Sequence, residues 1–482
     1  MVGKPNRWEL LEAWIVRTGM MSDETSELTL PKRSSPGHSV RRRWPRRRRG
    51  KRVGKSLNQA APYLGLVVFC FCATTYLVRL QDVAMVGAAG AILLLVLTGQ
   101  RTFRVGGPPG VLMLLWGAFV GLSVPTSIWL GPSIQGTIDV ARLLIIFVVT
   151  VNAITTRQHI HWLLVLLCIT MVVFPGFGGL KDYYAGVTRE VGRADWMGVF
   201  GNANLLALAM LMTMPFAVAF VAISRKKAAK LLWVAVIVSM CVVAVFTKSR
   251  AGFIALAGLG VAGIALSRRR ALAAGAVLAA GIAILAAAPD DFKERVAGII
   301  VMDEERDWSA RSRLIYWGIA ADIALTRPLT GTGVGTYERA NAEHGSPELT
   351  SGGQLWKDTH STWLNIWAEI GTPGLLAYLG AAISLLVLAF RTLRQIPPGD
   401  PFHLLLRAGI ASIFVFIVTG TFNTFHNVWF YYVIFGIMLA IMRIAETEYG
   451  EGGLKRATHA PGPSRSRRIH RRSRAVGTSP YS

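Results

Sequence analysis

The sequence predicts an all-α polytopic membrane protein with about twelve transmembrane helices and one long extracytoplasmic loop that contains short helices. Of its 482 residues, 52% are hydrophobic and 16% are charged, and the mean hydropathy is +0.43. Soluble domains carry about 25% charged residues, so this composition argues against a soluble enzyme. A polar stretch late in the chain predicts the long loop, because lipid cannot satisfy exposed backbone groups.

Twelve apolar runs are long enough to cross a bilayer, which takes about 20 residues. They lie at about residues 61–79, 83–99, 108–128, 138–155, 159–178, 199–223, 231–247, 251–267, 271–288, 362–390, 404–422 and 427–445. An even number of crossings places both termini on one side. The expected parts are an N-terminal tail (1–60), nine helices (61–288), the loop (289–361), three helices (362–445) and a C-terminal tail (446–482).

The distribution of basic residues predicts the orientation of these spans. Residues 1–60 contain 15 Lys and Arg against 5 Asp and Glu, and residues 443–482 contain 9 against 3, within a net charge of +25. The short loops on the side of the tails carry 12 basic residues, and those on the other side carry 5. Because cytoplasmic loops are enriched in Lys and Arg, both tails are predicted to be cytoplasmic and the long loop to lie outside.

The run from Arg41 to Arg52, RRRWPRRRRGKR, is compatible with nucleic-acid binding. Its position just before the first apolar span favours another interpretation, a tail that sets topology and contacts anionic lipid. We therefore expect membrane lipids and no nucleic acid among the partners. The four cysteines all fall within apolar runs, so we expect neither a disulfide framework nor a metal site.

Within the polar stretch, the segment RSRLIYWGIAADIALTRP has isoleucines at every fourth position, which predicts a helix that ends at its proline. Arg313 and Trp317 are four residues apart and therefore share a face of this helix. Taken alone, the pattern is typical of a helix lying on the membrane surface. The glycines of TGTGVGTYE have no βαβ pattern around them, so they predict a tight turn rather than a dinucleotide site.

Several polar residues gather on the predicted outer face. Lys248 and Arg250 lie between two spans, where the positive-inside rule disfavours basic residues. Arg313 lies in the long loop, and His360 lies at the mouth of the next span. Each has a structural interpretation when considered singly: a snorkelling side chain, a solvated arginine, or a histidine that caps the span. The run Asp358–Ser361 contains Asp, His and Ser, but adjacency in sequence is not a catalytic triad.

Together, Arg250, Arg313 and His360 suit transfer from a lipid diphosphate. Arginine stays charged and pairs bidentately with phosphate oxygens, which stabilises a diphosphate leaving group. Histidine can accept a proton from an attacking hydroxyl near neutral pH. Asn202 and Asn204, which enter the sixth span, also need polar partners because amide groups are costly in an apolar helix.

The motifs GR…GVFGNANLLAL, KSRAGF, RLIYW, PLTGTGVGTYE and HSTWLNIWAEIGTPGLL follow one another from about Gly192 to Leu376. This series resembles the O-antigen ligase and polymerase superfamily of bacterial membrane glycosyltransferases. The resemblance implies transfer of a glycan from undecaprenyl diphosphate to an acceptor hydroxyl, on lipid A core or another glycan. It places this reaction at the outer face of the bacterial cytoplasmic membrane, without a metal ion or other cofactor.

The resemblance also implies roles for individual residues. His360 is similar to the family histidine taken as general base. Arg250 and Arg313 look like the arginines that hold the donor diphosphate, and Glu369 matches the acidic position after the histidine. We further expect Lys248 and Arg193 to take part in donor diphosphate binding, and Trp317 and Asn204 to support the site with Glu369. Ser361 departs from the family, in which Asn more often follows the histidine.

Other functions remain open at this point. A polymerase that extends the glycan and a protein O-oligosaccharyltransferase would use the same residues. A transporter of polysaccharide or small molecules is the alternative from another class, and Arg142 inside a span and the break Phe174-Pro175-Gly176 fit it weakly. A flippase or scaffold for envelope polysaccharide is the third functional hypothesis, after the enzyme and the transporter. Only the enzyme needs the outward set of two arginines and a histidine.

Cysteine labelling in intact cells tests the predicted orientation. A Cys introduced at Ser346 should react with a membrane-impermeant maleimide, and a Cys introduced at Ser224 should not, because only the first position is expected outside. Permeabilised cells are the control, in which both positions should react. Labelling of intact cells at position 224 but not at 346 would overturn the orientation.

Overall fold

The computed structural model of the protein describes residues 49–190, 192–266, 269–287, 304–344 and 355–450. Within these ranges the regular structure is helical throughout, without a strand. The elements are α2 (Arg49–Ala73), η1 (Val78–Leu80), α3 (Gln81–Leu97), α4 (Gly107–Ser123), α5 (Leu130–Ala153), α6 (Arg157–Met171), η2 (Val172–Gly176), α7 (Phe177–Tyr184), η3 (Gly198–Gly201), α8 (Ala203–Ile223), α9 (Lys227–Phe246), α10 (Arg250–Leu266), α11 (Arg270–Ala287), α13 (Glu304–Thr326), α14 (Tyr337–His344), α16 (Thr362–Leu393), α17 (Pro401–Thr421) and α18 (Trp429–Tyr449).

A helix lies at each of the twelve positions that the apolar runs predict. In the described ranges, eight helical segments are long and apolar enough to cross a membrane, and three further apolar helices are shorter. The three shorter ones are Ala60–Ala73, Gly107–Ser123 and Arg250–Ala265. The protein is therefore an all-helical, multi-pass membrane protein. The expected tails at 1–48 and 451–482, and the loop residues 288–303 and 345–354, lie outside the described residues.

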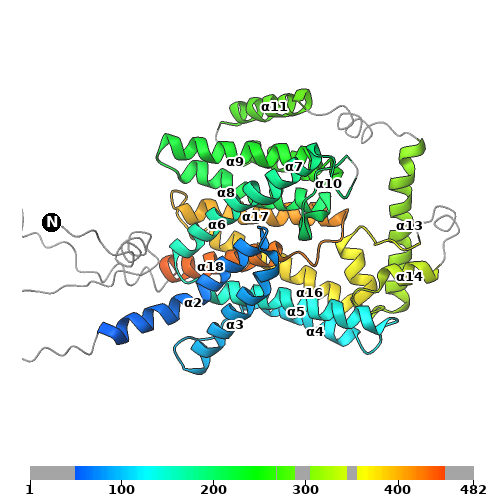
Figure 1. Ribbon diagram of the computed structural model, residues 1–482, viewed down its shortest axis with the longest axis horizontal. Helices are drawn as coiled ribbons and strands as arrows, with labels where there is room; N and C mark the ends of the chain where they lie inside the picture. Colours follow the sequence, from blue (N-terminus) through cyan, green and yellow to red (C-terminus); the bar gives the residue numbers. More distant parts are fainter. Residues whose placement is uncertain (1–48, 191, 267–268, 288–303, 345–354, 451–482) are drawn as a thin grey trace, which may run out of the picture.

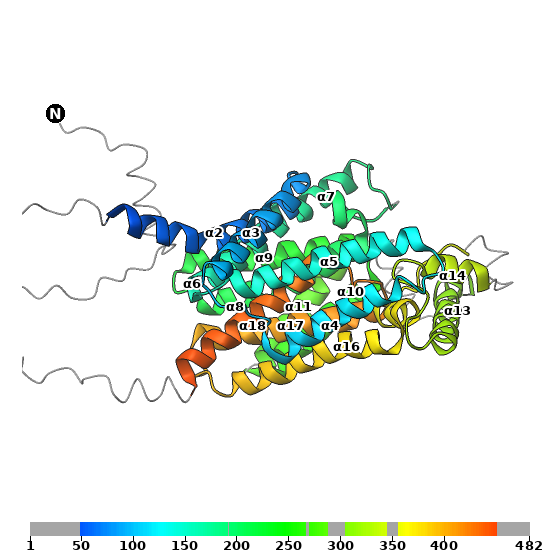
Figure 2. The ribbon, with the colours of Figure 1, turned by 90° about the horizontal axis from the view of Figure 1, so that it is seen from below.

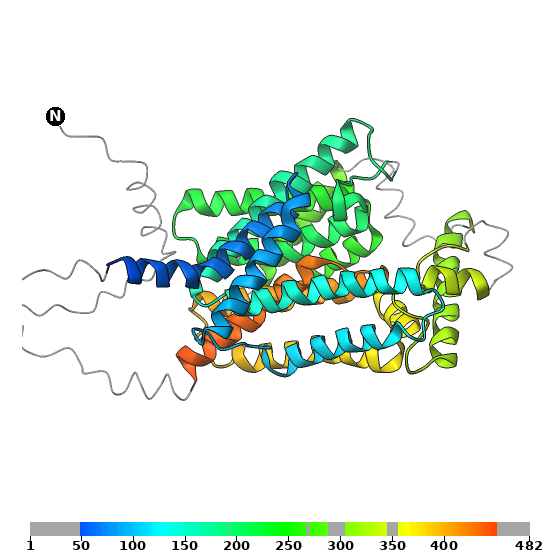
Figure 3. The same cartoon turned by 60° about the horizontal axis from the view of Figure 1, so that its bottom comes forward.

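The helices form an elongated bundle with two distinct ends (Figure 1). Helices α13 and α14 lie together at one end, which we call the loop end, and α2 begins and α18 finishes at the opposite end, the tail end (Figures 2 and 3). Loops that the sequence assigns to one side meet at the loop end. For example, the Thr126 and Thr330 hydroxyls lie 2.8 Å apart, and those of Thr359 and Thr424 lie 3.2 Å apart.

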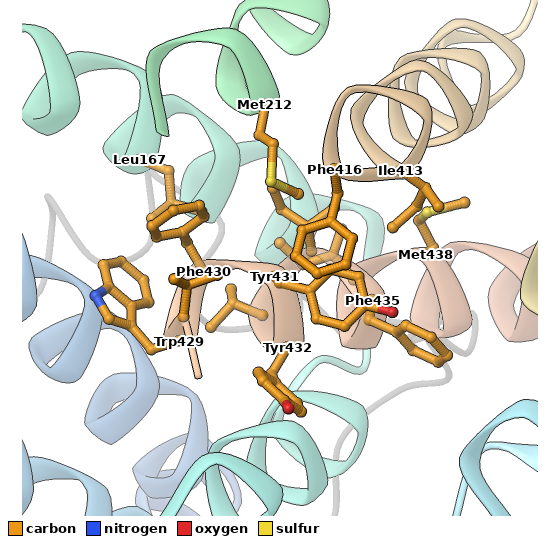
Figure 4. Packing of buried hydrophobic residues seen from close by; sticks show 14 of the residues in the cluster. Leu167, Met212, Ile413, Phe416, Trp429, Phe430, Tyr431, Tyr432, Phe435 and Met438 are labelled. Carbon is orange, nitrogen blue, oxygen red and sulfur yellow. The ribbon is translucent and has the colours of Figure 1, made fainter. Parts of the chain in front are cut away.

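The core of the bundle surrounds α18. Every residue of α18 from Trp429 to Met442 is buried, as expected for a helix that is apolar on all sides. Phe416 of α17 stacks on Tyr431 with ring centroids 3.9 Å apart, and Met438 and Phe435 fill the space beside them (Figure 4). The last span is thus held by packing on all of its faces.

Prolines move two boundaries from their expected positions. The third span ends at Ser123 rather than near 128, because Pro125 has no N–H to donate to the carbonyl of Gly121 and so cannot continue the helix. The fifth expected span, 159–178, is interrupted by the π-helical turn η2, which contains Pro175. Proline lacks the N–H that a regular α-helix needs, and a local widening of the turn accommodates it.

The backbone of α16 is broken at Gly371, whose φ of 79° and ψ of 179° are not helical. The break frees the N–H of Thr372 and the carbonyl of Ala368 from their helical partners. The carbonyl of Glu369 also has no helical donor, because Pro373 carries no N–H. Buried backbone groups of this kind need other partners.

The glycine turn supplies these partners. The N–H of Thr332 donates to the carbonyl of Ala368 at 3.0 Å, and the N–H of Gly333 donates to the carbonyl of Glu369 at 2.8 Å. The N–H of Thr372, which the break leaves without a helical acceptor, donates to the carbonyl of Pro328 at 2.7 Å. Gly331, Gly333 and Gly335 all have positive φ, which confirms the tight turn expected from the sequence.

The same turn holds the loop between α4 and α5. The N–H of Ile128 donates to the carbonyl of Thr332 at 3.0 Å, and the N–H of Val334 donates to the hydroxyl of Ser123 at 3.4 Å. Residues 328–336 are therefore hydrogen-bonded both to α16 and to the segment that joins α4 to α5. This attachment places the C-terminal end of α13 and the start of α14 against the loop end.

Replacing Gly371 with alanine should destabilise the protein by roughly 1–3 kcal/mol, because an L side chain is strained at this φ and ψ. Its Cβ would also meet the backbone of Leu329. Gly380→Ala in the same helix is the control: its Cβ makes ordinary contact with Leu112, and alanine is favoured in a helix interior. Thermal unfolding in detergent measures both. Equal unfolding temperatures for the two variants would contradict the role of the break.

Candidate functional site

Two non-glycine residues in the described ranges have positive φ, Lys248 at 51° and His360 at 52°. This backbone conformation is uncommon for such residues and is found disproportionately at functional sites. Each of them lies in one of the motifs that sequence analysis singled out, just before α10 and just before α16. Both turns therefore hold their side chains in geometry that the chain would not adopt without surrounding contacts.

The turn before α10 places Arg250 as the first residue of that helix. The hydroxyl of Ser249 accepts a hydrogen bond from the N–H of Gly252 at 3.2 Å, which caps the helix. Lys248 is only 2% exposed, and its ammonium lies 5.4 Å from the centre of the Tyr183 ring. A buried ammonium over an aromatic face is stabilised by the ring quadrupole.

Arg193 braces this turn from the loop before α8. Its Nε donates to the carbonyl of Thr247 at 2.8 Å, and its Nη2 donates to the Asn204 side chain at 2.8 Å. It also forms an ion pair with Glu190. The polar partner that Asn204 was expected to need is therefore Arg193, while Asn202 caps α8 by accepting from the N–H groups of residues 204 and 205.

Helix α13 brings Arg313 and Trp317 to the loop end. A small second core holds the helix there, made by Tyr316, Ile319, Ala320, Ile323, Tyr337, Ala340 and Ala368. The helix thus packs against α14 and α16, which goes beyond the surface helix that periodicity alone favoured. The indole N–H of Trp317 donates to the carbonyl of Thr359 at 3.1 Å, so α13 directly contacts the residue before His360.

The charge of Arg313 interacts both with that of Arg250 and with His360. Burial lowers the pKa of Arg313, and the positive charge of Arg250 lowers it further. Burial also lowers the pKa of His360. The negative charge of Asp358 raises this pKa, and the positive charges of Arg313 and Lys357 lower it. Arg313 is therefore the link between residues 250 and 360, and the hydrogen bond from Trp317 to Thr359 holds its helix against the segment of His360.

Neither guanidinium, on Arg250 or on Arg313, forms a hydrogen bond or an ion pair with a residue in the described ranges. His360 likewise makes no side-chain hydrogen bond there, and its ring lies beside that of Tyr316, with centroids 6.1 Å apart. The N-cap of α16 is Ser361, so His360 does not occupy the capping position. All three groups remain available to a ligand.

Glu369 has a different environment from that of His360. Its side chain is 3% exposed, and its carboxylate accepts from the N–H of Tyr337 at 2.9 Å, at the start of α14. A carboxylate at a helix N-terminus is favoured by the helix dipole. Glu369 therefore supports the glycine turn and α14, from which it is separated by more than 30 residues of sequence.

Two residues near His360 were missed as site residues by sequence reasoning. Asp358 accepts from the N–H of Thr359 at 2.7 Å and from the Asn365 side chain at 3.4 Å, and its charge acts on His360 and on His426. His426, in the loop between α17 and α18, is buried, and burial lowers its pKa to about 4. The sequence TFHN between the last two spans was the available signal for it.

Among the described residues, no group of three or more His, Cys, Asp or Glu side chains is arranged to hold a metal ion. Residues 235–379 match the profile of a protein family described as O-antigen ligase. The chain carries an O-antigen ligase domain. The matched range includes Arg250, Arg313, the glycine turn and His360, whereas Arg193 lies before it.

No curated protein matches the chain closely enough to count as a relative. The family of this domain comprises membrane proteins of ligase or polymerase type in surface polysaccharide biosynthesis. The family match also confirms the resemblance seen in the order of the motifs.

Two single substitutions should move the pKa of His360 in opposite directions. Lys357→Gln removes a positive charge and should raise it, and Asp358→Asn removes a negative charge and should lower it. Histidine-selective NMR titration in micelles measures both, with His360→Gln used to assign the resonance. A shift of the same sign in both variants would show that the imidazole does not sense these two charges.

Proposed function

We propose that the protein transfers a glycan from undecaprenyl diphosphate to an acceptor hydroxyl at the outer face of the cytoplasmic membrane. The observation that carries this proposal is that Arg313, within an O-antigen ligase domain, interacts electrostatically with both Arg250 and His360, on a helix that Trp317 joins to the segment of His360. The assignment of the loop end to the outer face rests on the distribution of basic residues.

The two arginines suit a dianionic leaving group. Like charges that are partly buried and lack ion pairs repel each other, so the site is favoured when an anion lies between them. A diphosphate offers several oxygens to the forked donors of both guanidinium groups. In the transition state the negative charge on the leaving diphosphate increases, and these fixed positive charges stabilise it more than the ground state.

The proposed reaction is a substitution at the first sugar carbon of the donor. The bond from that carbon to the diphosphate oxygen breaks with its electron pair leaving on the diphosphate, and a bond to the acceptor oxygen forms. His360 takes the proton of the acceptor hydroxyl. Burial and the neighbouring positive charges lower its pKa, which keeps the imidazole neutral, as a base must be, at neutral pH.

The supporting residues act by position in this proposal. Arg193 and Asn204 hold the turn that carries Lys248 and Arg250, so Arg193 acts on the donor through that turn. Trp317 links the helix of Arg313 to the segment of His360. Glu369 holds the start of α14, directly after the glycine turn, by accepting from the N–H of Tyr337. Lys248 adds a positive charge next to the donor arginine.

Reconstitution tests the reaction itself. Purified protein in liposomes, supplied with an undecaprenyl-diphosphate-linked glycan and a candidate acceptor, should release undecaprenyl diphosphate in step with glycosylated acceptor. The amounts of the two products should be equal. Transport of intact donor across the bilayer without cleavage would reject the enzyme and favour a transporter.

Arg250→Lys and Arg313→Lys should each reduce turnover about 10- to 100-fold, although both keep the charge. Lysine loses the planar fork, and hydrogen bonds to charged groups contribute about 1.5–3 kcal/mol. Arg339→Lys is the control, since Arg339 forms a surface pair with Glu343 on α14. Turnover is measured at saturating donor. Wild-type rates in either of the first two variants would make that arginine a surface charge only.

His360→Gln should reduce turnover by about 10²- to 10⁴-fold, because glutamine has no basic nitrogen. Donor binding should persist, and the wild-type rate should fall as pH drops through the lowered pKa of His360. His344→Gln is the matched control: His344 lies at the same end, on α14, and pairs with Asp322. Ordinary activity of His360→Gln with an unchanged pH profile would end the assignment of the base.

A further inference from the structure

Three arginines from distant parts of the chain meet at the tail end, far from the candidate active site. Arg101 and Arg104 lie in the loop between α3 and α4, and Arg443 lies in the last two turns of α18. The charges of both loop arginines act on Arg443. They converge at the C-terminal end of α5.

Asn152 of α5 fixes the loop arginines in place. Its side chain is 3% exposed, accepts from the N–H of Arg104 at 2.9 Å and donates to the carbonyl of the same residue at 2.8 Å. The carbonyl of Asn152 accepts from Nη1 of Arg101 at 2.9 Å. The loop backbone at Arg104 is therefore anchored to a buried amide, and the guanidinium of Arg101 is held by the carbonyl of the same asparagine.

Arg443 is anchored to the same helix end. Its Nη1 donates to the carbonyl of Val151 at 2.7 Å, and its Nη2 donates to the carbonyl of Ile154. These are the last carbonyls of α5, where the helix dipole carries roughly half a negative charge. Capping of α5 thus explains part of the arrangement, but three full positive charges exceed what one helix end offsets.

No carboxylate in the described ranges compensates the remaining charge. None of the three arginines forms an ion pair there, although Glu446 follows Arg443 by three residues on α18. Arg157 at the same end shows the contrasting case, since it pairs with Asp400 at 2.8 Å and with Glu448. Arg101 and Arg443 are partly buried, and charges in that setting are usually paired, so the missing partner points to a ligand that exposed Arg104 can also contact.

We propose that Arg101, Arg104 and Arg443 form a binding site for a phosphate group at the tail end of the bundle. Arginine forks suit phosphate oxygens, and basic pockets between transmembrane helices on the cytoplasmic side bind anionic headgroups. The phosphate belongs either to an anionic phospholipid or to a free phosphate ion, which present the same oxygens. This site is independent of the reaction proposed at the loop end.

Native mass spectrometry of the full-length protein tests the site. The protein in neutral detergent is titrated with phosphatidylglycerol, with phosphatidylcholine as the zwitterionic reference, and separately with inorganic phosphate. Arg104→Gln and the double variant Arg101→Gln, Arg104→Gln are compared with wild type. Arg104 is the safest position, because its backbone rather than its side chain makes the described hydrogen bonds. Arg391→Gln, an exposed arginine in the last turn of α16, is the control.

Wild type should retain phosphatidylglycerol in preference to phosphatidylcholine, and its affinity should fall about fivefold for each arginine removed. The control should bind as wild type does. If inorganic phosphate competes with phosphatidylglycerol, the site also binds free phosphate. If inorganic phosphate does not compete, the site is specific for the lipid headgroup. Equal affinity of wild type and the double variant for both ligands would overturn the site, whatever the outcome of the transferase assay.

Discussion

The loop end depends on one backbone constraint, the break in α16 at Gly371. A helix inside a membrane protein cannot leave its carbonyls without donors, because no bulk water is there to replace them. Here the donors come from the glycine turn, whose N–H groups at Thr332 and Gly333 lie close enough because the turn has no side chains at its tightest points. The break and the turn therefore require each other.

This mutual requirement determines where the polar segment lies. Once the turn is bound to α16, α13 must end beside it and α14 must begin beside it, with Glu369 at the N-terminus of α14. The second small core and the hydrogen bond from Trp317 then fix the rest of α13 against the start of α16. The helix that carries Arg313 is thus held against the segment of His360 by contacts that involve neither of these two charges.

Local patterns were sufficient for the helices and for the chemistry that they carry. Hydropathy over about 20 residues indicates a span wherever it falls in the chain, so helices occur at all twelve predicted positions. Pro328 and the alternating glycines predict a stop and a turn because their effects on φ and on the N–H are intrinsic to those residues. Arg250, Arg313 and His360 were recognisable as candidates because arginine and histidine have distinctive charges and pKa values.

The tertiary structure decided which of these groups share a site and what the other polar residues do. The sequence placed Arg193 and Asn204 beside the donor, whereas folding joins them to each other and to the carbonyl of Thr247. It offered no reason to connect Glu369 with Tyr337, or Asn152 with Arg104. Side chains bonded to backbone groups tens of residues away leave no periodic signal, because any residue supplies the same N–H and carbonyl. Residue type and spacing therefore determine the helices and the available chemistry, and long-range packing alone determines the partners.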